Sequence, residues 1–169
     1  MKELLLSEKY RPKTIDDTIL LPRIKSLFKD GLNKNVIFYG HFGTGKTSLA
    51  RILIGKYTME SPYMELNCSM ETSIDVLRSK VDTFCSSVAM GFDVLNENHK
   101  KDDIKYVFLD EYERMSVQAQ DAFKVFVEEY SAKNVRFILV TNHINKISQG
   151  VLSRFSRINF DPENLEEEK

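Results

Sequence analysis

The stretch Gly40–Thr47 constrains this chain more than any other part of its sequence. It reads Gly-His-Phe-Gly-Thr-Gly-Lys-Thr and matches the pattern G-x-x-x-x-G-K-[ST]. The apolar run Val36–Tyr39 precedes it and residues 48–54 are typical of a helix, so the pattern lies between a strand and a helix, as phosphate-binding loops do. Its glycines let successive backbone N–H groups point at a phosphate, and the helix N-terminus adds a partial positive charge. The chain is therefore predicted to bind a nucleoside triphosphate.

Two side chains of this loop have specific predicted roles. Lys46 can neutralise the β and γ phosphate oxygens, and the Thr47 hydroxyl can ligate Mg²⁺. The alternative is an ordinary Gly-rich turn that matches the pattern by chance, which the flanking strand and helix disfavour. The sequence thus predicts ATP and Mg²⁺ as ligands, with the nucleotide held by Gly40, Gly43, Thr44, Gly45, Lys46, Thr47 and Ser48.

Composition sets further limits. A chain of 169 residues with 42% hydrophobic residues suits one globular domain, and a net charge of -1 gives no overall basic field for nucleic acid. Cys68 and Cys85 lie far apart and are predicted to be packed, reduced thiols. No apolar run approaches the roughly 20 residues that a membrane span needs, and the start Met1–Glu3 is not typical of a signal peptide. We therefore expect a cytoplasmic setting with no membrane contact.

Apolar segments of strand and helix type alternate along the chain. Strands are predicted at 36–39, 63–67, 104–109, 135–140 and 157–160, and helices at 47–57 and 73–89. A further helix, with Ser116 as its N-cap, follows from the apolar face formed by Ala119, Ala122, Phe123, Phe126, Val127 and Tyr130. The polar stretch 91–103 is expected to be a loop. Continuous apolar strands that alternate with helices predict an α/β fold with a parallel sheet covered on both faces.

Two acidic residues follow the predicted third strand. Asp110 is placed to hold Mg²⁺ through a water, and Glu111 to orient and deprotonate the water that attacks the γ-phosphate. The alternative is a pair of surface acids at the end of a strand. The phosphate loop upstream favours the catalytic interpretation.

Two later residues have roles that spacing alone leaves open. Asn142 follows the fourth strand and could hold the attacking water in line, or it could simply cap the strand and turn the chain. Arg154 precedes the fifth strand and could be an arginine finger for a neighbouring subunit's γ-phosphate. It could equally be a surface charge paired with a carboxylate.

Several short motifs occur in an order that resembles the AAA+ clamp-loader ATPase subunits. They are Glu8–Pro12, Thr14–Asp17, the phosphate loop, Ser73–Arg78, Asp110–Glu111, Asn142 and Ser153–Phe155. The resemblance is to the small subunits of replication factor C and, most of all, to the large subunit of tailed-phage clamp loaders. It covers the chain from about residue 7 to residue 161. It implies a P-loop, RecA-like AAA+ fold with five parallel strands in the order 5-1-4-3-2, and assembly into a ring-like hetero-oligomer.

The resemblance also implies a role for each matching residue at the nucleotide. Lys46 and Thr47 take the Walker A roles, Asp110 and Glu111 the Walker B roles, and Asn142 that of sensor 1. Catalysis within this family would thus involve Glu111, Lys46 and Asn142, with Arg154 acting in trans. Arg11 and Pro12 would lie beside the adenine.

The partners implied are a sliding clamp, other loader subunits and primer–template DNA. Arg78 would face the central channel, where this family tracks the DNA backbone. In the helix 73–89, Ile74, Leu77 and Val81 are expected to be buried, which leaves Arg78 and Lys80 on another side. Contacts to phosphates would make binding independent of sequence and sensitive to salt. The alternative is that both are solvated helix charges.

The chain departs from the family pattern in three places. The family's Ser-Arg-Cys is Ser-Arg-Phe here, and Tyr112–Glu113 replaces the Ala-Asp or Cys-Asp of cellular members. The sequence ends at Lys169, where the family continues into a helical lid and a collar. We therefore expect a nucleotide-binding domain at 1–162, the start of a linker at 163–169, and no lid or collar. Such a chain alone is expected to be monomeric and a very slow ATPase.

Other functions remain as alternatives at this point. One is another AAA+ ATPase acting on DNA, such as a helicase loader or a Holliday-junction motor. Another is a nucleotide-gated subunit that assembles but does not hydrolyse ATP, against which Glu111 and Arg154 argue. The leading interpretation is a clamp-loader ATPase domain in the cytoplasm, or in the host-cell cytoplasm if phage-encoded.

Overall fold

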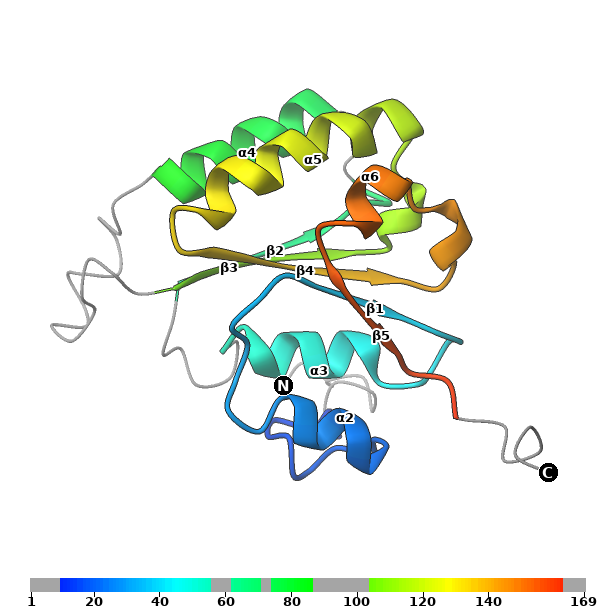
Figure 1. Ribbon diagram of the computed structural model, residues 1–169. Coiled ribbons are helices and arrows are strands. Elements are labelled where there is room, and N and C mark those ends of the chain that lie inside the picture. Colours follow the sequence, from blue (N-terminus) through cyan, green and yellow to red (C-terminus); the bar gives the residue numbers. More distant parts are fainter. Residues whose placement is uncertain (1–9, 56–61, 71–73, 87–103, 163–169) are drawn as a thin grey trace, which may run out of the picture.

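A parallel sheet organises the computed structural model, which describes residues 10–55, 62–70, 74–86 and 104–162. Its strand order is β2-β3-β4-β1-β5, the predicted order read from the other edge (Figure 1). The strands are β1 (Val36–Tyr39), β2 (Tyr63–Asn67), β3 (Lys105–Asp110), β4 (Val135–Thr141) and β5 (Ser156–Asn159). The predicted fold class is confirmed.

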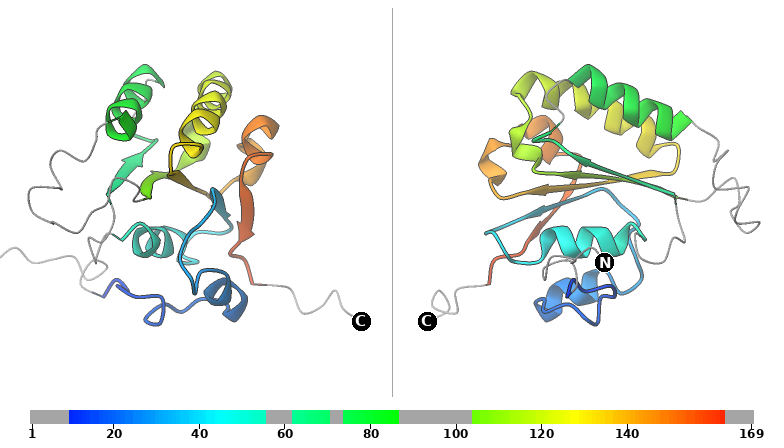
Figure 2. Two further views of the ribbon diagram at one scale, coloured as in Figure 1. Left: turned by 60° about the vertical axis from the view of Figure 1, so that its left-hand side comes forward. Right: turned by 180° about the vertical axis from the view of Figure 1, so that it is seen from behind.

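Helices cover both faces of this sheet. α4 (Ile74–Ser86), α5 (Val117–Ser131) and α6 (Gln149–Leu152) lie on one face, and α2 (Pro22–Leu27) and α3 (Lys46–Leu53) lie on the other (Figures 1 and 2). Two short 3₁₀ helices, η1 (Tyr112–Arg114) and η2 (Ile144–Lys146), follow β3 and β4. In the part of the chain that the structure describes, no lid or collar accompanies this layer arrangement, and no helix combines the length and apolarity of a membrane span.

Alternation of side chains along the central strands builds two cores. Towards α4 and α5 point Ile37, Val107, Leu109, Phe137 and Leu139. Towards α2 and α3 point Val36, Phe38, Phe108, Ile138 and Val140. Because successive residues of a strand face opposite sides, continuous apolar runs are what a sheet buried on both faces requires.

Several predicted boundaries need correction. β3 begins one residue later than predicted and includes Asp110, β4 continues to Thr141, and β5 spans 156–159 and not 157–160. The helix predicted at 47–57 ends at Leu53, because Gly55 adopts a left-handed backbone with φ 72° that terminates helices. Residues 56 and 57 lie outside the described part.

The two long helices carry the predicted apolar faces with one exception. Leu77 and Val81 of α4 are buried, whereas Val88, the loop 91–103 and the side chain of Ile74 lie outside what the structure describes. In α5 the Ser116 hydroxyl accepts a hydrogen bond from the Ala119 N–H, which confirms the N-cap. Ala122 is exposed, contrary to prediction.

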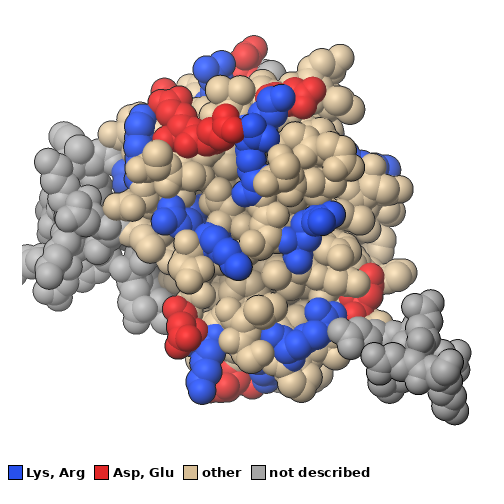
Figure 3. Space-filling view, in the orientation of Figure 1, with Lys and Arg blue, Asp and Glu red and all other residues tan. Residues whose placement is uncertain are grey.

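Both signs of charge occur on the face of the molecule seen in Figure 3, where Lys and Arg side chains cross the middle and Asp and Glu side chains lie mainly towards the upper and lower edges. This distribution fits the net charge of -1. Because the net charge gives no overall attraction for a polyanion, contact with one would depend on local groups of basic residues.

Candidate functional site

The predicted nucleotide residues converge at one edge of the sheet. Parallel strands end at a common edge, so the segments that follow β1, β3 and β4 meet there. They surround a cavity of about 570 Å³. It is lined by residues 42–48 and by Asp110, Glu111, Glu113, Arg114, Val140, Asn142, His143 and Lys146.

Backbone conformation explains the glycines of the phosphate loop. Gly40, Gly43 and Gly45 have φ values of 137°, 76° and 90°, in the region that L side chains rarely adopt. Gly45 is the N-cap residue of α3, so the loop passes directly into the helix at Lys46. The N-terminus of α3 thus opens onto the cavity.

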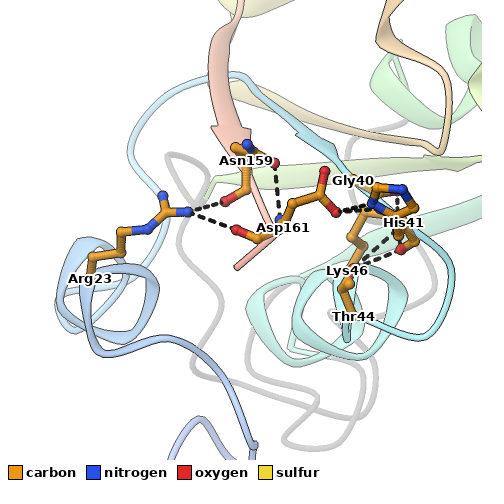
Figure 4. Close-up of polar contacts among 7 residues, drawn as sticks. All are labelled: Arg23, Gly40, His41, Thr44, Lys46, Asn159 and Asp161. Atoms are coloured by element: carbon orange, nitrogen blue, oxygen red, sulfur yellow. Dashed lines mark hydrogen bonds and ion pairs between the residues drawn. The ribbon is translucent and has the colours of Figure 1, made fainter. Parts of the chain in front are cut away.

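Lys46 is a buried ammonium held by the loop itself. Its Nζ donates to the carbonyl oxygens of Gly40 at 2.8 Å and His41 at 2.5 Å, and to Thr44 Oγ1 at 3.2 Å (Figure 4). Burial lowers the pKa of Lys46, and nearby carboxylates, Asp161 foremost, oppose that shift. A charged group held only by neutral oxygens is suited to exchange them for phosphate oxygens.

Thr47 and Asp110 form a contact between α3 and the end of β3. The Thr47 hydroxyl donates to Asp110 Oδ2 at 3.2 Å, and Asp110 Oδ1 accepts from the Glu111 N–H at 3.0 Å. Burial raises the pKa of Asp110, and these hydrogen bonds oppose the shift. A hydroxyl beside a carboxylate is the oxygen donor set that fits Mg²⁺, which usually completes its shell with waters and substrate phosphates.

Glu111 has a left-handed backbone, with φ 53° and ψ 42°, that is uncommon for a residue other than glycine. Its Oε1 accepts from Asn67 Nδ2 at 3.3 Å, and its Oε2 lies 3.6 Å from Arg114 Nε. Asn67 ends β2 and pairs with Asp110 in the sheet register. Neither Asn67 nor Arg114 was predicted as a site residue, although Asn67 stands at the end of a predicted strand.

Asn142 reaches the same cavity from the end of β4. Its backbone N–H and its Nδ2 both donate to Glu113 Oε1 at 3.4 Å. The side-chain amide of Asn142 thus lies at the cavity with one of its two N–H donors directed at Glu113. Glu113 was not predicted as a site residue.

Arg154 lies away from the phosphate loop. Its Nε donates to Glu128 Oε1 at 2.7 Å and its Nη1 to the Gly150 carbonyl at 2.5 Å. It lines a second cavity of about 430 Å³ with Arg136 and Lys34, near the amino ends of β4 and β5, and that cavity shares no lining residue with the first. Within the chain the structure thus pairs Arg154 with a carboxylate and does not bring it to the nucleotide site.

The remaining predicted residues lie outside the first cavity. Arg11 and Pro12 are half-buried, and the segment after them approaches the loop, since Leu20 Cδ2 lies 3.0 Å from where a Gly45 Cβ would stand. Arg78 and Lys80 are exposed on α4. None of these four lines the phosphate-loop cavity.

Both cysteines are free thiols. Cys68 is buried, and burial raises the pKa of the half-buried Cys85 to about 12. A thiol with such a pKa stays protonated and unreactive near neutral pH. Cys68 is packed as predicted, whereas Cys85 is only partly buried.

Comparison with known proteins finds relatives that are named as subunits of replication factor C. The chain is 39% identical to replication factor C small subunit 2 of Pyrobaculum islandicum, over 96% of this chain and 50% of that protein. It is 37% identical to replication factor C small subunit of Saccharolobus solfataricus, over 96% and 48%. It is 35% identical to replication factor C subunit 4 of Caenorhabditis elegans, over 94% and 48%. The chain thus spans about half the length of these relatives.

Solved structures confirm the fold. The RuvB Holliday junction branch migration motor of Thermotoga maritima superposes with a TM-score of 0.65 at 18% identity, over 90% of this chain and 49% of that one. Identity this low shows a shared fold alone. The family described as "ATPase family associated with various cellular activities (AAA)" matches residues 36–162, which is most of the chain. This chain therefore belongs to the AAA family of ATPases.

Proposed function

We propose that this chain is the ATP-binding and ATP-hydrolysing module of a sliding-clamp loader in DNA replication. The observation that carries the proposal is one cavity lined by Lys46, Thr47, Asp110, Glu111 and Asn142. Similarity to replication factor C small subunits over 96% of the chain supports the clamp-loader assignment. The nucleotide-binding domain comprises residues 1–162.

Each side chain has a task in hydrolysis. The Lys46 ammonium exchanges the carbonyls of Gly40 and His41 for the β and γ phosphate oxygens. Thr47 would hold Mg²⁺ directly and Asp110 would hold it through a water, and the ion would supply positive charge against the phosphates. Glu111 accepts a proton from the attacking water, and the side-chain amide of Asn142 helps to orient that water.

Partners use other surfaces of the chain. Arg154 acts as an arginine finger on the nucleotide of a neighbouring subunit, which requires release from Glu128. Arg78 and Lys80 contact DNA phosphates, and Arg11 and Pro12 lie beside the adenine. ATP binding would let the assembled loader hold the clamp on primer–template DNA, and hydrolysis would release it.

The test is nucleotide affinity in the wild-type chain and in Lys46→Ala. Loss of the buried ammonium is expected to weaken Mg-ATP binding at least tenfold, about 1.4 kcal/mol. Titration of a fluorescent ATP analogue measures it, with Lys34→Ala, an exposed lysine outside the cavity, as the matched control. Equal affinity in wild type and Lys46→Ala would refute the assignment.

The clamp-loader part needs a separate measurement. The full-length protein, assembled with its partner subunits, is expected to hydrolyse ATP faster when clamp and primer–template DNA are both present. Stimulation by Holliday junctions in place of clamp and primer–template DNA would favour a branch-migration motor instead.

A further inference from the structure

Asp161, two residues beyond β5, contacts the first turn of the phosphate loop (Figure 4). Its Oδ1 accepts from the His41 N–H at 2.6 Å and lies 2.7 Å from His41 Nδ1. β1 and β5 are parallel neighbours, and the Phe160 N–H donates to the Tyr39 carbonyl at 2.8 Å. The sheet therefore brings Asp161 and the loop together.

Gly40 permits this close approach. A Cβ at position 40 would stand 2.8 Å from Asp161 Oδ1, closer than real Cβ contacts, and 3.1 Å from its backbone nitrogen, which is tighter than most of them. Next along the chain, the carbonyl of His41 accepts from Lys46 Nζ. One side of His41 thus binds the carboxylate of Asp161, and the other binds the ammonium that is proposed to receive the phosphates.

Asp161 is itself held from two directions. Its backbone N–H donates to Asn159 Oδ1 at 3.0 Å. From α2, Arg23 Nη2 donates to the carbonyls of Asn159 at 3.0 Å and Asp161 at 3.3 Å (Figure 4). Because these contacts hold the backbone of Asp161 on both sides, its side chain projects toward His41 from a fixed point of the chain.

We propose that Asp161 is a positioning residue for nucleotide binding, which holds His41 and so fixes the entrance of the phosphate loop in the shape that receives phosphates. The inference rests on the proposed nucleotide-binding function. His41 is the first residue after Gly40, so its N–H precedes the N–H groups that surround a phosphate in such loops. Asp161 therefore does not occupy the place of the phosphates.

Loop positioning by Asp161 and repulsion of the phosphates by its charge change the affinity for Mg-ATP in opposite directions. This difference makes the proposal testable. If the carboxylate positions the loop, its removal weakens Mg-ATP binding. If its negative charge only repels the phosphates, its removal strengthens binding. Asp161→Asn separates the two, because the amide oxygen still accepts from the His41 N–H but carries no charge.

The experiment titrates a fluorescent ATP analogue with Mg²⁺ into the wild-type chain and its variants. We expect the Kd to rise about tenfold in Asp161→Ala and at most threefold in Asp161→Asn. His41→Ala keeps the backbone bond and should show a rise of about threefold. The double variant Asp161→Ala/His41→Ala should equal Asp161→Ala, since loss of Asp161 already removes both of its contacts with His41. Asp30→Ala, an exposed acid after α2, is the charge-matched control and should bind like wild type.

Unchanged or tighter binding by Asp161→Ala overturns the proposal. If Asp161→Ala does not fold by circular dichroism, Asp161→Asn/His41→Ala carries the test, with about fivefold weaker binding expected and wild-type affinity as the refuting result. A wild-type chain that binds no Mg-ATP would refute the proposed function, whereas wild-type binding with unaffected Asp161 variants would refute this inference alone.

Discussion

Glu111 combines an unusual backbone with side-chain contacts that hold it. A left-handed conformation at a residue other than glycine costs on the order of 1–3 kcal/mol and persists only where neighbours impose it. Here Asn67 donates to Oε1, and Arg114 lies beside Oε2. The outcome is a carboxylate with a fixed direction at the edge of the cavity.

Glu111→Gln should separate binding from hydrolysis. Glutamine keeps the oxygen that accepts from Asn67 but cannot take a proton from water, so ATP should bind normally while turnover falls roughly 10²-fold or more. Steady-state hydrolysis by the assembled loader measures this. Glu129→Gln, on the exposed side of α5, changes the same charge and should turn over normally. Normal hydrolysis by Glu111→Gln would assign the base to another residue.

At this scale the sequence predicts motif residues better than their contacts. Lys46, Thr47 and Asp110 could be placed together because a local pattern and a parallel sheet determine where they lie. The partners Glu113 for Asn142 and Glu128 for Arg154 could not, because they depend on side-chain packing between segments far apart in sequence. Nothing in the spacing of residues distinguishes a paired arginine from a free one.

Among the elements, α5 connects the hydrolysis site to the segment before α6 through a buried amide. Gln120 is 1% exposed, and its Nε2 donates to the carbonyls of Met115 at 3.2 Å and Lys146 at 3.1 Å. Its Oε1 accepts from the Ser148 N–H at 2.7 Å. Both N–H donors of this amide are thus used, together with one of the two acceptor positions of its oxygen. These bonds fix α5 to the end of η2 and to the segment that follows it.

Gln120→Ala should lower the stability of the fold. Its removal leaves three partly buried backbone groups without this partner, and each such group costs up to about 1–3 kcal/mol where water does not replace the amide. We expect the free energy of unfolding to fall by about 3 kcal/mol, measured by urea denaturation. Gln118→Ala, an exposed position on the same helix, should change it by less than about 0.5 kcal/mol. Equal midpoints for the two variants would contradict the role of this amide.

Element prediction succeeded where periodicity was long and failed where elements are short. The apolar spacing of α5 and its Ser116 cap are readable because 15 residues repeat the same face. The six-residue α2 and the short helices η1, η2 and α6 offer too few turns for any period to show. Their positions depend on contacts with the sheet.

At the scale of the whole molecule, different residues lie at the two ends of the sheet. The phosphate-loop cavity lies at the carboxyl ends of the strands, and Arg154 lies near the amino ends of β4 and β5. A chain with this geometry cannot apply Arg154 to its own nucleotide. The proposed action of Arg154 on a nucleotide therefore requires a second subunit.

The chain alone should therefore hydrolyse ATP very slowly, with turnover per chain that rises with protein concentration. A finger supplied in trans contributes roughly 10³–10⁵ in rate, and a monomer lacks it. Steady-state ATPase across a hundredfold range of concentration measures the effect. Arg154→Ala should remove the dependence on concentration, while Arg157→Ala, an exposed arginine of β5, should retain it. Rapid turnover independent of concentration would show that one chain holds a complete site.

The contact of Gly40 with Asp161 has a consequence for how these two positions vary together among relatives. A relative with alanine at the position of Gly40 has no room for the carboxylate, so we expect a smaller residue, or a shifted chain, where this protein has Asp161. Conversely, an engineer who exchanges the phosphate loop for that of a relative must exchange the residues after β5 with it. We therefore expect substitutions in the two segments to depend on each other, although most of the chain separates them.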